Sequence, residues 1–120
     1  MIDVWYMKIK MKHDRFRKAR DGRAIMLDIF CSKCSTKVMW YQKDGVGSLL
    51  RCYLNRIHAP TELEKLQNDS NIIDPKNMPN LICPKCKAVL GSPMRYLDGR
   101  LAFRLRPGYI YKKQSKEIGY

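Results

Sequence analysis

The sequence has few acidic residues, only two histidines and no long hydrophobic run. Its 120 residues include 11 Asp or Glu against 24 Lys or Arg, which gives a formal net charge of +13. A surplus of this size is informative about partners rather than about the fold, and polyanions are the first candidates. No stretch is long and apolar enough to span a bilayer. We therefore expect no membrane partner.

The opening segment, MIDVWYMKIKMK, lacks the basic head and the uninterrupted apolar core of a secretory signal peptide. We therefore expect a cytoplasmic protein, in a reducing compartment where cysteines seldom form lasting disulfides. A chain of 120 residues fits one domain with a small core. A bound metal would add useful stability to such a core.

Motifs of the common enzyme classes are also missing. The sequence has no glycine-rich phosphate loop, no paired acids in a pocket-like motif and no Ser-His-Asp arrangement. His13 and His58 have no partner at metal-ligand spacing, so we expect them at the surface or in the core, His58 being the better spare ligand. We expect neither catalysis nor a small-molecule substrate.

Four of the five cysteines form two C-x-x-C pairs, CSKC at Cys31 and Cys34 and CPKC at Cys83 and Cys86. A two-residue gap lets a tight turn direct both sulfurs at one cation, and two such turns complete the tetrahedron that structural zinc prefers. Residues 35–82 separate the pairs, a longer gap than the roughly 15 to 20 residues of most zinc ribbons. We predict one structural zinc closed around an insertion. Two redox dithiols or plain buried cysteines are the alternatives.

The segments beside the cysteine pairs predict antiparallel strands. Each pair is followed by a strand-like run, an Asp-Gly turn and a second run: STKVMWYQKDG with SLLRCYLNRI, and KAVLGSPMRYLDG with RLAFRLR. Asp-Gly between alternating runs is a strong hairpin signal, because both residues tolerate positive φ. In the last run Leu101, Phe103 and Leu105 face one way. Another Asp-Gly at residues 21–22 and the alternating WYMKIKMK bring the expected total to four or more strands.

Residues 59–80 break this pattern, and they form the only stretch in which acidic residues outnumber basic ones. Thr61 and Glu64 in PTELEKLQ have capping-box spacing and predict a short helix. The following NDSNIIDPKNMPN predicts a loop. We therefore predict a single zinc-binding β domain over residues 1–111, with residues 59–80 as the insertion, and a basic tail over residues 112–120.

One segment carries a family resemblance. NLICPKCKAVLGSPMRYLDGRLAFRL resembles the second half of yippee-like zinc proteins, with an apolar pair, the cysteine turn, a Leu-Gly step and two strands around a Gly turn. The separation of the cysteine pairs is also similar to that family and to its relatives of the β-tent fold, including the ligand-binding domain of cereblon. The resemblance covers about residues 24–106. It implies two antiparallel sheets pinned at their apex by one zinc, with Cys31, Cys34, Cys83 and Cys86 as ligands. Only Trp5 and Trp40 are present, so a cereblon-type tryptophan cage is not expected.

The fifth cysteine, Cys52, allows two interpretations. RCYLN resembles the catalytic surroundings in methionine sulfoxide reductase B, another member of this fold class, and Arg51 could lower the pKa of the thiol. In that family, however, the nucleophile follows the second cysteine pair, whereas Cys52 lies between the pairs. We favour the alternative that Cys52 alternates with Leu50 and Leu54 on the buried face of a strand.

Two basic stretches that contain aromatic residues predict nucleic-acid binding. KHDRFRKARDGR and RLRPGYIYKKQSK interleave cations with rings, which suits a phosphate backbone with exposed bases. We expect RNA rather than DNA, because arginine-rich extensions suit folded RNA and no segment looks like a major-groove helix. The candidate contacts are Lys12, Arg15, Phe16, Arg17, Lys18, Arg20, Arg23, Arg100, Arg104, Arg106, Lys112 and Lys113.

The sequence therefore predicts a mainly β, non-catalytic zinc module that binds structured RNA, with other proteins of a ribonucleoprotein such as the ribosome as further partners. The rival hypothesis is a protein-interaction adaptor of the yippee-like type. In that case the acidic insertion and a surface at Trp40 and Tyr41 would meet a partner. A thiol enzyme that uses Cys52 is the third hypothesis.

Overall fold

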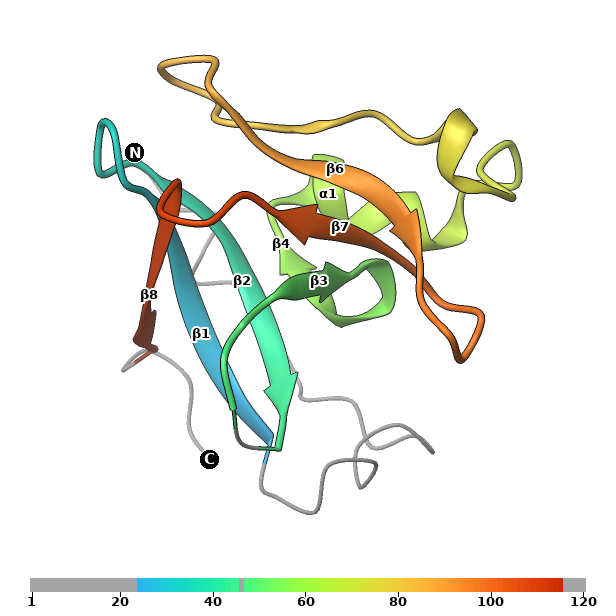
Figure 1. Cartoon of the computed structure of the whole chain (residues 1–120), viewed down its shortest axis with the longest axis horizontal. Helices are drawn as coiled ribbons and strands as arrows, with labels where there is room; N and C mark the ends of the chain where they lie inside the picture. The colour runs from blue at the N-terminus through green and yellow to red at the C-terminus, as the bar shows by residue number, and fades with distance from the viewer. Residues whose placement is uncertain (1–23, 46, 116–120) are drawn as a thin grey trace.

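The computed structural model describes residues 24–45 and 47–115, and these residues form two antiparallel four-stranded sheets (Figure 1). The first sheet, in the order β4-β2-β1-β8, contains β1 (Ala24–Cys31), β2 (Lys37–Asp44), β4 (Ile57–Ala59) and β8 (Ile110–Gln114). The second, in the order β3-β7-β6-β5, contains β3 (Arg51–Tyr53), β5 (Leu81–Ile82), β6 (Val89–Arg95) and β7 (Leu101–Leu105). The predicted fold class is confirmed.

Each cysteine pair lies at the loop end of a hairpin, with one such hairpin in each sheet. Cys31 is the last residue of β1 and Cys34 lies in the turn before β2, and the last residues paired between these two strands are Phe30 and Lys37. The second pair lies between β5 and β6, where Ile82 pairs with Val89. Both loops are therefore held at their two ends by ladder hydrogen bonds, which fixes the turns that carry the thiols.

The predicted hairpin at Asp98 and Gly99 is confirmed, since this turn joins β6 to β7 and Gly99 has a φ of 92°. The predicted hairpin at Asp44 and Gly45 is wrong. Gly45 does turn the chain with a φ of 82°, but the chain then crosses to the second sheet, where β3 pairs with β7. Asp-Gly favours a tight turn but does not choose the next strand's partner, and here Cys52 is buried opposite Phe103.

The insertion contains the predicted short helix, α1 (Thr61–Glu64), which continues as a 3-10 helix, Lys65–Asn68. The predicted capping box is wrong. Pro60 is the N-cap residue and no side chain caps the helix, because Thr61 is already its first residue. The rest of the insertion is a loop with a single 3-10 turn, Pro75–Asn77, in which Asp74 accepts a hydrogen bond from the backbone N–H of Lys76.

The core contains side chains of both sheets. Ile29 and Met39 of the first sheet and Leu81, Leu90 and Phe103 of the second are all 0% exposed. The alternation expected along β7 is largely present. Phe103 and Leu105 are buried, Leu101 is half-buried and Arg104 is exposed, although Ala102 on the arginine side is also buried.

Several sequence predictions fall outside the described residues: the alternating WYMKIKMK, the Asp-Gly turn at residues 21–22 and His13. At the other end, β8 runs to Gln114, so residues 112–114, which we assigned to a tail, continue a strand that pairs with β1. Within residues 24–45 and 47–115, no helix is long and apolar enough to cross a membrane.

Replacing Phe103 with Ala should lower the free energy of unfolding by about 3–5 kcal/mol, because the substitution removes a fully buried ring and leaves a cavity between the sheets. Denaturant unfolding at saturating zinc would measure the loss. Leu97→Ala is the control: Leu97 is 95% exposed, so its truncation should change stability by no more than about 0.5 kcal/mol. Equal effects of the two substitutions would contradict the assigned core.

Candidate metal centre

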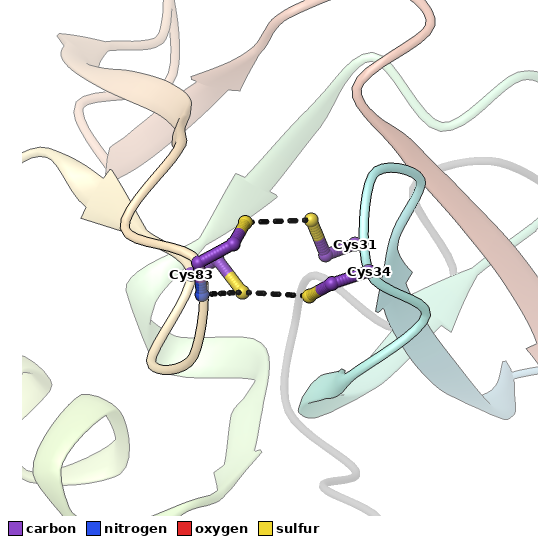
Figure 2. Close-up of side chains that lie close together, drawn as sticks. Cys31, Cys34 and Cys83 are labelled. Atoms are coloured by element: carbon purple, nitrogen blue, oxygen red, sulfur yellow. Dashed lines mark hydrogen bonds between the residues drawn. The ribbon is translucent and has the colours of Figure 1, made fainter.

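The four paired cysteines converge on one point. The sulfurs of Cys31, Cys34, Cys83 and Cys86 all lie within 4.8 Å of one another. Two close approaches cross between the sheets: Cys31 Sγ lies 3.6 Å from Cys86 Sγ, and Cys34 Sγ lies 3.5 Å from Cys83 Sγ. Figure 2 shows Cys31 and Cys34 on one loop directed toward Cys83 on the other. The predicted set of four ligands is therefore brought together.

The two turns that carry these cysteines have the same backbone geometry. In the first, Cys31 N–H donates to Thr36 O and Ser35 N–H donates to Cys31 O; in the second, Cys83 N–H donates to Ala88 O and Lys87 N–H to Cys83 O. Ser35 and Lys87 occupy equivalent places and have positive φ values of 60° and 65°. Residues other than glycine adopt this conformation uncommonly, so its occurrence at the same place in both turns marks them as two copies of one metal-binding turn.

The spacing of the sulfurs fits a tetrahedral metal. A Zn–S bond of about 2.3 Å gives a tetrahedron whose sulfur–sulfur edge is about 3.8 Å. The cross-sheet distances of 3.5 and 3.6 Å lie close to that edge. An all-cysteine set with no open position is also typical of structural rather than catalytic zinc. The four cysteines are positioned to bind one metal ion, which is consistent with the predicted single structural zinc.

The thiols themselves favour a cation. Hydrogen bonds with the side chain and the backbone of Thr36 lower the pKa of Cys34 to about 6. A hydrogen bond from the backbone of Ala88 lowers the pKa of Cys86, but desolvation and the neighbouring thiols outweigh it and raise the pKa to about 11. Without a cation, the first thiolate therefore discourages ionisation of the others. A bound zinc ion would offset the charge of all four thiolates.

Cys52 lies apart from this cluster. It is 0% exposed in β3, and burial raises the pKa of its thiol. The interpretation of Cys52 as a buried strand residue is confirmed, whereas the idea that Arg51 lowers the pKa of this thiol is wrong because desolvation dominates. One detail of the interpretation is also wrong: Leu54 is buried as expected, but Leu50 is 59% exposed. Leu50 precedes the strand, in the crossing between the sheets.

His58 is not a spare ligand in the structure. Its ring Nε2 lies 3.1 Å from Oε1 of Gln42, in the first sheet. The surface expected around Trp40 and Tyr41 is also wrong. Trp40 is 1% exposed and donates to Asp28 Oδ1, and Tyr41 is 2% exposed with its hydroxyl accepting from the backbone N–H of Tyr53. Both rings are buried, so an adaptor would have to use another surface.

The structure describes only some of the residues predicted to contact nucleic acid. Lys12, Arg15, Phe16, Arg17, Lys18, Arg20 and Arg23 lie outside the described residues. Arg104 and Arg106 are exposed at the C-terminal end of β7, and Lys112 and Lys113 are exposed on β8. Arg100 is half-buried: its guanidinium lies over the ring of Tyr53, 3.7 Å from the centroid, and bonds to Asp98.

Sequence reasoning missed the surroundings of Arg100. Tyr53 packs edge-on against Tyr96, and Arg51 lies over Tyr96, 4.3 Å from the centroid. These residues belong to β3 and to the turn between β6 and β7, so their spacing forms no motif. Arg51 and Tyr53 at alternate positions of a strand were the only local sign that their side chains share a face.

In comparisons with known proteins, no family model, no curated protein and no solved structure matches this chain.

The protein should contain about one zinc per chain, and Cys83→Ser should lose both the metal and the folded state, because ligation by cysteine thiolates is coupled to folding. Metal analysis together with circular dichroism would test this. Folded wild-type protein that contains no zinc would contradict the assignment of the centre.

Cys52→Ser should retain the zinc, because Cys52 lies outside the cluster of four sulfurs. In native wild-type protein, its buried thiol should react with an alkylating reagent at neutral pH much more slowly than in unfolded protein. Mass spectrometry of the labelled peptides would follow the reaction. Loss of zinc in Cys52→Ser would show that the ligand set is wrong, and rapid labelling of Cys52 would show that it is accessible.

Proposed function

We propose that this chain is a non-catalytic, zinc-stabilised module that binds structured RNA within a cytoplasmic ribonucleoprotein. The formal net charge of +13 on 120 residues is the observation that carries the proposal. Such an excess destabilises a compact state through self-repulsion and is most useful when a polyanion offsets it. Part of the excess lies on the described surface, at Arg104, Arg106, Lys112 and Lys113.

Aromatic rings accompany these cations. Arg106 lies over the ring of Tyr109, 4.0 Å from the centroid, and Lys33 lies 5.6 Å from the same centroid. On β1 and β8, Phe30 stacks against Tyr111 at 5.0 Å, with Lys113 5.8 Å from the Phe30 centroid. Cations held beside rings support interactions with both phosphates and unstacked bases, which is the chemistry of single-stranded and looped RNA.

The metal centre supports a rigid platform. Ser32, inside the first cysteine turn, donates its backbone N–H to Tyr109 O. This backbone hydrogen bond therefore links the zinc-binding turn to the Arg106–Tyr109 pair. A relationship to the β-tent fold, and within it to the yippee-like proteins, belongs to this proposal, and the two sheets joined through one four-cysteine centre support it.

The arginine-rich segment 12–23 should supply the main electrostatic interaction with RNA. Replacing Arg15, Arg17, Lys18 and Arg20 with Ala removes up to four cations that can each neutralise a phosphate. The slope of log affinity against log salt should therefore become shallower by about 0.7 for each phosphate no longer neutralised on single strands, and by about 0.9 on duplex. Binding to a structured RNA over a salt series would measure this change.

The matched comparison is Lys112→Ala combined with Lys113→Ala, which removes two exposed cations from β8. Zinc content and circular dichroism should be unchanged in both variants. An unchanged slope in the segment variant would move the RNA-binding surface elsewhere. If wild type fails to bind RNA near physiological salt, and nuclease treatment of an extract leaves its captured partners in place, the adaptor hypothesis replaces this one.

A further inference from the structure

A cavity of about 220 Å³ lies among the Asp44 end of β2, strand β3 and the turn between β6 and β7. The cysteine turns join the opposite ends of β2 and β6, at Lys37 and Val89. The cavity is therefore separate from the metal centre. No motif in the sequence marks it, because its lining comes from distant segments of the chain.

Two guanidinium groups are held in place at the wall of this cavity by aromatic rings. Arg100 lies over Tyr53 at 3.7 Å and Arg51 lies over Tyr96 at 4.3 Å. The two rings contact each other edge to face, with centroids 5.6 Å apart. All four side chains line the cavity. The stacking orders the guanidinium groups before any ligand arrives, which lowers the entropic cost of binding.

The acidic residues of the lining are already engaged. Asp44 accepts from Arg56 at 2.6 Å, and Asp98 lies 2.9 Å from a guanidinium nitrogen of Arg100. Desolvation raises the pKa of Asp98, but the hydrogen bonds from Arg100 outweigh it and lower the pKa below its usual value. Lys43 and Arg51 bring two more positive charges to the same cavity. The net charge of the side chains that line the cavity is therefore positive.

The Tyr41 hydroxyl adds a neutral hydrogen-bond donor to the lining of the cavity. The hydroxyl of Tyr41 accepts a hydrogen bond from Tyr53 N–H at 2.8 Å, which leaves its own hydrogen as a donor. Burial raises the pKa of this phenol well above its usual value, so it stays protonated. The guanidinium groups of Arg51 and Arg100 and the Tyr41 hydroxyl thus line the same cavity, and charged donors of this kind recognise an oxyanion.

We propose that this cavity binds a phosphate-bearing nucleotide, either free or at the 5′ end of an RNA. The guanidinium groups and the Tyr41 hydroxyl would contact the phosphate, and the tyrosine rings offer surfaces beside which a base can pack. About 220 Å³ is less than the roughly 300 Å³ or more of pockets that enclose a drug-sized ligand, so the cavity would take the phosphate and the atoms next to it and is too small for a dinucleotide cofactor. The RNA-end form rests on the proposed function, whereas the free-nucleotide form does not.

The position of the cavity supports the RNA form. Asp44, which lines it, pairs with Ala24 at the start of β1. Arg23, the last residue of the arginine-rich segment, directly precedes Ala24 in the sequence. The cavity therefore lies beside the point where the segment proposed to bind the RNA backbone joins the domain.

Calorimetric titration of the zinc-loaded full chain with adenosine 5′-monophosphate, adenosine and inorganic phosphate tests the proposal. The monophosphate should bind at least about tenfold more tightly than adenosine, because the charged donors face its phosphate. Arg51→Ala should weaken binding of the monophosphate by about tenfold or more. Tyr41→Phe, which keeps the ring but removes the donor, should weaken it by a smaller factor.

Arg104→Ala is the matched control. Arg104 pairs directly with Arg51 across β3 and β7, is exposed and does not line the cavity, so this variant loses the same charge at a neighbouring site. Whatever its effect on RNA, it should bind the monophosphate within about twofold of wild type. Zinc content and circular dichroism confirm that each variant is folded. Equal losses in Arg51→Ala and Arg104→Ala would overturn the cavity as the site.

A second titration compares one RNA oligonucleotide with a 5′-phosphate and with a 5′-hydroxyl. Tighter binding of the phosphorylated end, abolished in Arg51→Ala, supports the RNA-end form. If RNA binds but neither its 5′-phosphate nor the monophosphate has any effect, the cavity proposal is overturned and the proposed function survives. Binding of the monophosphate without binding of RNA would overturn the proposed function and retain the cavity as a site for free nucleotides.

Discussion

Four thiolates can share one coordination sphere only when a cation offsets their charge, and this requirement joins the two sheets of the protein. Each sheet supplies one hairpin loop with two sulfurs, and the loops meet with sulfur–sulfur distances of 3.5 and 3.6 Å across the gap. The hydrophobic core lies between the same two sheets, where Ile29 and Leu81 are fully buried. A small domain with little apolar surface to bury gains from such a connection, because the metal contributes directly to folding.

The metal centre could be predicted because each half of it is encoded by a short continuous segment of the sequence. Each C-x-x-C turn determines its own geometry, and two such turns have few other uses. The turn at Asp98 and Gly99 was predictable for the same reason. The turn at Asp44 and Gly45 was not, because the turn is local but the partner of β3 is chosen by burial of Cys52 opposite Phe103. The burial of Trp40 was not predictable from local sequence either: its residue type made it a candidate for an exposed surface, but its ring is buried.

The nucleotide cavity could not be read from the sequence, because its geometry depends on the sheet topology. Arg51 and Tyr53 reach it from β3, and Tyr96 and Arg100 reach it from the turn between β6 and β7. These segments come together only because β3 leaves the hairpin predicted for it and pairs with β7. The wrong hairpin and the missed cavity therefore have the same cause, a non-local strand pairing that turn chemistry cannot specify.

The location of the cavity also affects which of the protein's cations are available to attract a phosphate. A zinc ion with four thiolates carries a net charge of about −2, so cations near it are partly engaged in balancing that centre. Lys33 and Lys85 occupy the same position in the CSKC and CPKC turns, and both are exposed. Their charge would therefore be shared between a zinc centre and a bound polyanion. The cations of the cavity lie at the far ends of β2 and β6 from this centre. Among the described residues that line the cavity, four cationic side chains stand against two carboxylates, so the net charge there favours an anion.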